Sequence, residues 1–177
     1  MIVYTCKITG DEFLSDSFPL LEVTDAEGNV IDGLMMTTSK MVPKSEDDVD
    51  IGCGNAFGGD APEEAAAANV EMVNNVCEKF SYTQTELSAT QFKSYLKEYM
   101  GVLLEKLKKK DAPVEEKKAF RERAANAGKY FLSNFKELDF YLGPSFNPES
   151  MIIAMYPEGA LAPNFYFIMD GLNKDKF

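Results

Sequence analysis

Residues 88–137 read SATQFKSYLKEYMGVLLEKLKKKDAPVEEKKAFRERAANAGKYFLSNFKE, and the first part of this stretch predicts a helix. Ser88 and Gln91 have the spacing of a capping box, in which two side chains satisfy backbone amides that a first helical turn leaves free. Apolar residues then recur every three or four positions, as one buried face of a helix requires. They are Phe92, Tyr95, Leu96, Tyr99, Leu103 and Leu107.

A second helix follows after a short connection. We expect Asp111 to cap its first turn, where Pro113 is also tolerated because that turn needs no amide from it. The apolar positions of this helix are Phe120, Ala124, Ala127, Phe131 and Phe135. Because short connections join antiparallel neighbours, residues 88–137 predict a helical hairpin. We expect the hairpin to pack on a sheet through its aromatic residues.

The segments on both sides of the hairpin have the composition of β-strands. They are short, rich in β-branched and aromatic residues, and bounded by turn-forming residues. The expected strands are residues 1–8, 20–24, 30–38, 140–142, 151–156 and 165–169. Between Val70 and Tyr82 the apolar residues have a mixed spacing that leaves strand and helix both open. The chain is therefore β-rich with an inserted helical hairpin, which is an α+β fold class.

Charge is divided sharply along the chain. Residues 45–78 carry nine acidic residues and no Lys or Arg. Residues 106–129 carry nine of the eighteen basic residues, namely Lys106, Lys108, Lys109, Lys110, Lys117, Lys118, Arg121, Arg123 and Lys129. Because summed charge steers association, the pattern indicates separate partner surfaces rather than one catalytic pocket. The alternative is a solvated helix face supported by glutamates at i,i+4 spacing.

The segment over residues 43–68 combines much of the acidic run with flexible residues. Its glycines are Gly52, Gly54, Gly58 and Gly59. Like charges repel and glycine raises the entropic cost of ordering, so we expect a mobile acidic loop. Asp47, Asp48 and Asp50 could hold calcium weakly through oxygen ligands, although they lack the spacing of an EF-hand. The alternative is a loop that only interacts with solvent.

Composition excludes several classes of function. The chain has 177 residues, a net charge of −11 and no histidine. Its length suits a single domain over residues 1–177, and its acidity argues against nucleic-acid binding. Without histidine, neither a Ser-His-Asp nor a Cys-His catalytic site is possible. Cys6, Cys53 and Cys77 fit neither a zinc spacing nor a disulfide framework.

The same composition bears on location and assembly. The chain has no apolar run of about 18 residues, so we expect no membrane span. Its N-terminal residues, Met1 to Lys7, lack the basic and apolar regions of a secretory signal. We therefore expect a cytoplasmic protein, and a monomer rather than a stable oligomer.

Several stretches resemble the translationally controlled tumour protein family. Towards the end of the chain they are Asn134-Phe135-Lys136, Phe140-Tyr141-Leu142-Gly143, Asn147-Pro148 and Asp170-Gly171-Leu172. At the start and in the middle they are Met1-Ile2-Val3-Tyr4, Asp11-Glu12, Asp50-Ile51-Gly52, Met72-Val73-Asn74-Asn75-Val76 and Tyr95-Leu96-Lys97-Glu98-Tyr99-Met100. The resemblance runs essentially from end to end, without large insertions.

The chain also departs from the family pattern. It has Phe57-Gly58-Gly59-Asp60 where the family usually has Ser-Ala-Glu, and Gly143-Pro144 where the family usually has Gly-Glu. Pro157 stands where a basic residue commonly follows the tyrosine. The chain ends in Phe177, whereas family members often end in cysteine. These changes bear on loop contacts and on C-terminal thiol roles, and not on the fold.

The resemblance implies a twisted β-tent core, mainly antiparallel, with a projecting helical hairpin and a flexible acidic loop. It also favours a strand over residues 70–82. It implies a cytosolic, multi-partner protein of growth and survival rather than an enzyme, with no cofactor apart from weakly bound calcium.

Two partner sites are implied. Asp11 and Glu12 stand at the position associated with a Ras-like GTPase, Rheb, where a carboxylate near the nucleotide would repel phosphate or compete for Mg²⁺ and so promote exchange. The helical region is associated with tubulin and microtubules. The residues of this chain that would bind such an acidic partner are Lys106, Lys108, Lys109, Lys110, Lys117, Lys118, Arg121 and Arg123.

Alternatives to these sites stay open. Asp11 and Glu12 could simply cap the turn after Gly10. The β-tent also resembles the fold of methionine sulfoxide reductases, so the alternative function is a redox enzyme or a general protein chaperone on the same fold. A reductase needs a low-pKa cysteine beside positive charge, whereas Cys53 lies in the acidic stretch. We therefore expect no enzyme.

Overall fold

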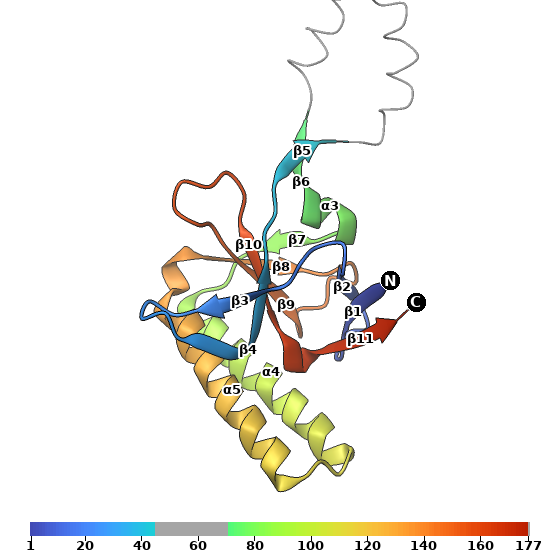
Figure 1. Ribbon diagram of the computed structural model, residues 1–177, viewed down its shortest axis with the longest axis vertical. Coiled ribbons are helices and arrows are strands. Elements are labelled where there is room, and N and C mark those ends of the chain that lie inside the picture. Colours follow the sequence, from blue (N-terminus) through green and yellow to red (C-terminus); the bar gives the residue numbers. More distant parts are fainter. Residues whose placement is uncertain (45–70, 177) are drawn as a thin grey trace, which may run out of the picture.

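The computed structural model describes residues 1–44 and 71–176 (Figure 1). Every strand pairing within these residues is antiparallel. The expected α+β architecture of antiparallel sheets with a helical hairpin is therefore confirmed. The expected acidic loop over residues 43–68 lies outside the described residues from residue 45 onward, and its first residue, Pro43, ends a strand.

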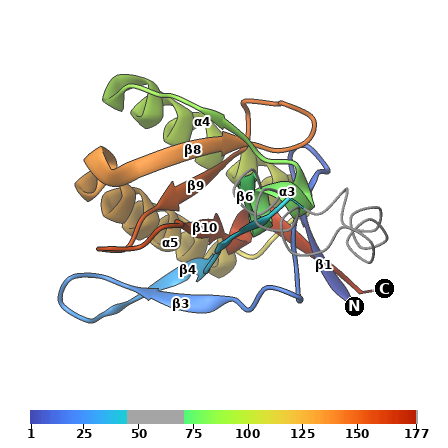
Figure 2. The ribbon, with the colours of Figure 1, turned by 90° about the horizontal axis from the view of Figure 1, so that it is seen from above.

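The described strands form a six-stranded, a three-stranded and a two-stranded sheet. In spatial order the first contains β3 (Leu21–Thr24), β4 (Val30–Thr37), β10 (Asn164–Ile168), β9 (Met151–Met155), β8 (Leu138–Leu142) and β7 (Thr83–Thr85). The second contains β11 (Leu172–Lys176), β1 (Ile2–Cys6) and β2 (Glu12–Ser15), so both ends of the described chain lie side by side (Figure 2). The third pairs β5 (Met41–Pro43) with β6 (Met72–Asn74).

The hairpin consists of α4 (Ala89–Lys109) and α5 (Val114–Ser133); it packs against the six-stranded sheet, and its turn end extends beyond that sheet (Figure 1). The capping box predicted at Ser88 and Gln91 is present in both directions. The 3-10 turns η1 (Phe135–Glu137) and η2 (Met169–Gly171) lead into β8 and β11. Phe135 therefore belongs to η1 and not to the second helix, although it still packs on the same core.

The central strands β8, β9 and β10 of the six-stranded sheet are buried on both faces, which explains their nearly continuous apolar sequences. Alternate residues enter two different cores. Phe140, Ile153 and Tyr166 pack against the hairpin, together with Phe92 and Phe131 from the helices. Their sequence neighbours enter the second core, against β1, β2 and α3 (Asn75–Phe80); these neighbours are Tyr141, Ile152, Ala154, Phe165 and Phe167. The prediction that the hairpin packs on a sheet through its aromatic residues is confirmed.

The strand favoured over residues 70–82 is mostly wrong. Only Met72–Asn74 is a strand, and α3 follows at once over Asn75–Phe80. The Asn74 side chain accepts hydrogen bonds from the backbone amides of Val76 and Cys77, which caps the helix and ends the strand. Ser81 then adopts a left-handed conformation that terminates α3.

Two glycines beneath the hairpin allow helix side chains to pack directly against the backbone. A Cβ atom at Gly171, in η2, would overlap the hydroxyl group of Tyr99 from α4. A Cβ atom at Gly33, in β4, would lie 2.8 Å from Cδ of Arg123 in α5. The side chains of Tyr99 and Arg123 therefore occupy the space that a Cβ atom at either glycine would need.

Candidate functional site

Positive charge collects at the tip of the hairpin, where α4 ends. Lys106, Lys108 and Lys109 occupy the last turn of α4, and Lys110 is its C-cap. A helix C-terminus carries partial negative charge, so lysines stabilise the helix at this end. Lys108, Lys109 and Lys110 are exposed, whereas Lys106 is half-buried.

The turn at the tip is built differently from what we expected. Asp111 does not cap α5; the N-cap is Pro113, and no side chain caps that helix. Asp111 instead adopts a left-handed conformation with φ of 53°. Its amide donates to the carbonyl of Lys108, and the amide of Ala112 donates to that of Leu107. These two bonds form a Schellman motif, so Asp111 terminates α4 and holds Lys110 in place.

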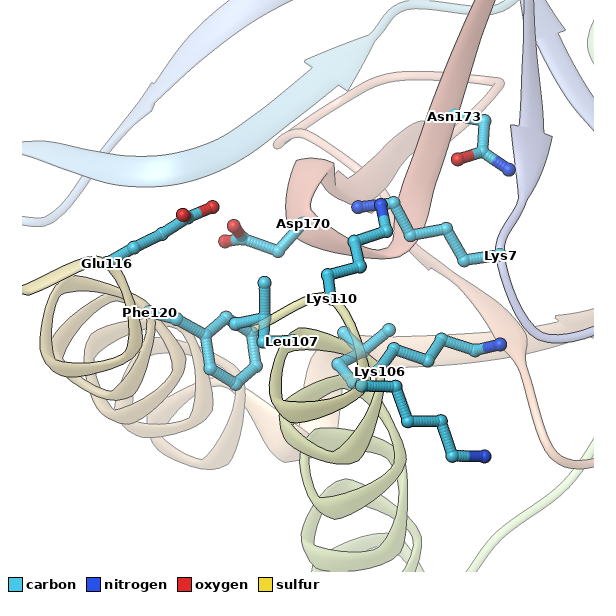
Figure 3. Close-up of a pocket in the computed structure, with 10 residues that line it drawn as sticks. Lys7, Lys106, Leu107, Lys110, Glu116, Phe120, Asp170 and Asn173 are labelled. Atoms are coloured by element: carbon cyan, nitrogen blue, oxygen red, sulfur yellow. The ribbon is translucent and has the colours of Figure 1, made fainter. Parts of the chain in front are cut away.

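A cavity of about 360 Å³ lies between the hairpin tip and the three-stranded sheet (Figure 3). Its apolar wall consists of Leu103, Leu107 and Phe120. The polar residues that line it are Lys7, Lys106, Lys109, Lys110, Glu116, Asp170 and Asn173. Four lysines therefore share one cavity with two carboxylates, in a protein whose net charge is −11.

Lys7 is the functional candidate that sequence reasoning missed. It follows β1 directly, and its amide donates to the carbonyl of Gly171 at 2.9 Å, which fixes it beside η2. Its side chain reaches toward that of Lys110 near Asp170 (Figure 3). Burial lowers the pKa of Lys7, and the charge of Lys110 lowers it further. No local motif marks Lys7, because strand pairing rather than sequence proximity brings it to the hairpin.

Arg123 does not belong to the free basic surface, which corrects the expected set. Its Nε lies 3.0 Å from Asp170 Oδ2, and its Nη2 lies 2.7 Å from Asp170 Oδ1. The two side chains are only 26% and 22% exposed. The hydrogen bonds to Asp170 raise the pKa of Arg123. This bidentate pair ties α5 to η2 and also occupies the Asp170 carboxylate.

The remaining basic residues of α5 lie outside the cavity. Lys118 and Arg121 are exposed, Lys117 is half-buried, and none of the three lines the cavity wall. Lys108 lies 3.7 Å from Glu105, an exposed i,i+3 pair of the kind that contributes little to stability. The structure therefore brings Lys106, Lys109 and Lys110 together and places the other predicted residues along the helix surfaces.

Asp11 and Glu12, the expected GTPase residues, have different environments. The Asp11 carboxylate accepts a hydrogen bond from the Ser145 hydroxyl at 2.6 Å and thereby holds the loop between β8 and β9. A Cβ atom at Gly143 would lie 2.8 Å from the same carboxylate, so only glycine fits there. Glu12 is exposed at the start of β2, on the edge of the three-stranded sheet opposite β11. Glu12 is therefore the more accessible of the two carboxylates.

The metal and thiol candidates lead to no site in the described chain. Asp47, Asp48, Asp50 and Cys53 lie outside the described residues. Residues 1–44 and 71–176 contain no group of three acidic or thiol side chains placed to hold a metal ion. Within these same residues, no helix combines the length and apolar character needed to cross a bilayer.

The two described cysteines lack the properties of a catalytic thiol. Cys6 is 1% exposed, and its Sγ lies 3.1 Å from the Ser150 hydroxyl. Burial raises the pKa of Cys77 to about 12, and neighbouring Glu78 raises it as well. A nucleophilic cysteine needs the opposite combination of access and a lowered pKa.

Comparisons with known proteins give one consistent result. A sequence model for translationally controlled tumour protein matches residues 1–173. The translationally-controlled tumor protein homolog of Schizosaccharomyces pombe is 36% identical over 178 residues, covering 100% of both chains. The Neurospora crassa homolog is 35% identical and 99% of each chain is covered. The solved structure of the S. pombe translationally controlled tumour-associated protein has a TM-score of 0.75 with 31% identity, and 100% of each chain is covered.

Proposed function

This chain belongs to the translationally controlled tumour protein family, and from that premise we propose that it is a cytosolic, non-catalytic regulator of growth and survival with several protein partners. Its main docking surface is the hairpin tip around Lys106, Lys109 and Lys110. The partner there is an acidic protein surface, of which the acidic tails of tubulin on microtubules are the example we propose.

The observation that carries this proposal is the concentration of uncompensated lysines at the hairpin tip. Lys106, Lys109 and Lys110 have no ion-pair partner within residues 1–44 and 71–176. They lie at the end of α4, at the turn of the hairpin, beside the end of β1 and β11. Complementary charge accelerates encounter with an acidic partner and makes the complex sensitive to salt.

Co-sedimentation with microtubules tests the proposal. Replacing Lys109 and Lys110 with Glu reverses the charge at the tip, and we expect binding to fall by about tenfold or more at low salt. The matched control replaces Lys93 and Lys97, two exposed lysines nearer the start of α4, with the same change in net charge. Equal losses in both double variants would mean that net charge alone is responsible and that the tip has no special role.

A second partner surface around Glu12 is supported by its exposure on edge strand β2. We propose that a Ras-like GTPase of the Rheb type meets this carboxylate and that contact with it promotes nucleotide exchange. Asp11 has a supporting role there, because it fastens the adjacent loop through Ser145. Exchange assays with Glu12→Val test the idea, since removal of the carboxylate should abolish the stimulation.

The redox alternative has little support in the described chain, where Cys6 is buried and the pKa of Cys77 is raised. Calcium binding stays a proposal for Asp47, Asp48 and Asp50. An assay of reductase activity on free and peptidyl methionine sulfoxide separates a redox enzyme from a binding protein, because only the enzyme would turn over either substrate.

A further inference from the structure

The cavity at the hairpin tip has the size and lining of a small-molecule site. Its volume of about 360 Å³ is within the range of ligand pockets. One wall is apolar, and the ammonium groups of Lys7 and Lys110 lie beside each other near Asp170, while Lys106 lines the cavity and extends away from this pair (Figure 3). Such a wall excludes water from one side of a bound anion and so strengthens its attraction to the lysines.

The charges around the cavity do not balance. Lys7, Lys106, Lys109 and Lys110 face two carboxylates, Glu116 and Asp170, and Asp170 already accepts two hydrogen bonds from Arg123. None of the four lysines forms an ion pair within the described part of the chain. The cavity therefore has an excess of positive charge that the protein itself leaves unneutralised.

Two separate elements supply this charge, so the excess is not a feature of the helix alone. Lys7 comes from the end of β1 and Lys110 from the end of α4, and their side chains converge (Figure 3). The lowered pKa of Lys7 agrees with this convergence, since burial and then the Lys110 ammonium disfavour its charged form and outweigh the opposing effects of Asp170 and Glu116. An anion placed between the two lysines would relieve the repulsion.

We propose that this cavity binds a small organic anion that carries several phosphate groups on a compact ring, of the inositol polyphosphate class. Several phosphates suit this rim because Lys7 and Lys110 converge from two elements, Lys106 and Lys109 lie further along the rim, and each ammonium acts as a point charge for one phosphate. A single phosphate would reach only part of the rim. The ring would then lie toward Leu107 and Phe120.

Calorimetric titration of the full-length protein with inositol hexakisphosphate tests the proposal at low ionic strength. We expect saturable binding that Lys7→Gln and Lys110→Gln each weaken by about tenfold. The control is Lys118→Gln, an exposed lysine on α5 outside the cavity, which should change affinity by less than about twofold. Glu116→Gln should tighten binding, because it removes a negative charge from the rim. Unfolding midpoints in urea verify that each variant is folded.

The other ligands distinguish the chemistry. Inorganic phosphate should bind much more weakly, and so should a hexaglutamate peptide. Vesicles that carry a phosphoinositide are titrated in parallel and show whether the ligand is a lipid headgroup or a soluble molecule. Binding to either ligand that is weakened by Lys7→Gln supports the site.

Three results would overturn the proposal. They are the absence of saturable binding, equal losses in the Lys7 and Lys118 variants, and tighter binding of hexaglutamate than of the inositol phosphate. The inference shares Lys106, Lys109 and Lys110 with the proposed function, but the titration contains no partner protein. Failure here would leave the microtubule result intact, and failure with microtubules would leave this site intact.

Discussion

Arg123 shows at the residue scale how the fold removes a basic side chain from the surface available to partners. In the sequence it is one of a run of basic residues on the second helix. In the fold it is half-buried and makes two hydrogen bonds to Asp170, which lies 47 residues away. Its role is therefore to join the hairpin to η2, and the surface that remains for partners is smaller than the basic run implies.

Replacing Arg123 with Lys should destabilise the protein. Lysine keeps the charge but cannot make the two parallel bonds, so we expect a loss of about 1–3 kcal/mol in the free energy of unfolding. Asp170→Asn should cost a similar amount, and the double variant should cost less than the sum because both changes break one interaction. Urea unfolding measures all three.

The control for Arg123 is Arg121→Lys, an exposed residue two positions earlier, which should change stability by no more than about 0.5 kcal/mol. Equal costs at the two positions would contradict the assigned role of Arg123.

Cys77 provides a test of thiol chemistry. With a pKa of about 12, its thiolate at pH 8 is on the order of a thousandfold rarer than that of a free cysteine. We expect iodoacetamide to alkylate Cys77 in the folded protein at a correspondingly low rate, which rises about tenfold per pH unit toward pH 10. Peptide mass spectrometry follows the reaction, and urea-unfolded protein is the control. Rapid alkylation at pH 7 in the folded state would revive the redox alternative.

At the scale of elements, the position of the hairpin depends on close packing against backbone. Tyr99 lies over Gly171, and Arg123 lies over Gly33. The aromatic residues supply most of the apolar contact, while the glycines set how closely the helices approach. Gly171 is adjacent to Asp170, which lines the tip cavity, so the contact of Tyr99 with Gly171 also positions this part of the cavity wall.

Gly171→Ala should therefore destabilise the protein, because the added methyl group overlaps the hydroxyl of buried Tyr99. We expect a cost of about 1–3 kcal/mol from the resulting overpacking. The same substitution at Gly101, in α4, meets no atom within 4 Å. It should stabilise the protein by up to about 1 kcal/mol through helix propensity. The thermal and urea unfolding midpoints should fall for Gly171→Ala and rise for Gly101→Ala. A shift of the same sign in both variants would show that close packing at Gly171 does not matter for stability.

At the scale of the whole molecule, the two proposed partner surfaces lie on different parts of the fold. β2 is one edge of the three-stranded sheet, whereas the residues of this sheet that line the tip cavity come from β11 and the end of β1. A partner at Glu12 and an acidic partner at the hairpin tip would therefore use separate contacts, and we expect them to bind independently.

Measuring both activities in both variants tests this independence. Glu12→Val should lose stimulation of nucleotide exchange and retain microtubule co-sedimentation, while the Lys109 and Lys110 double charge reversal should do the reverse. Both are changes of exposed residues, so stability should move by no more than about 0.5 kcal/mol per substitution. Loss of both activities in each folded variant would show that the two surfaces are one.

Features that depend on neighbours within a turn or two of the chain could be predicted from the sequence. The capping box at Ser88 and the apolar spacing from Phe92 to Leu103 predict α4 because helix contacts join residues three and four apart. The strands β4, β9 and β10 were likewise readable from composition. The strand predicted over residues 70–82 was mostly wrong because the Asn74 side chain caps a helix within an apolar segment whose spacing suits either structure.

Contacts between charged residues far apart in the sequence follow from the fold and could not be predicted from local patterns. Lys7 reaches the hairpin tip because β1 pairs with β11, and this pairing joins the two ends of the described chain. Arg123 leaves the free basic surface because η2 brings Asp170 beneath α5. These contacts join residues far apart in sequence. They depend on the register of the paired strands, which is set by how the sheet faces pack and not by the residues next to each charge. The cavity lined by Lys7 and Lys110 therefore exists because the pairing of β1 with β11 places the end of β1 beside the hairpin tip.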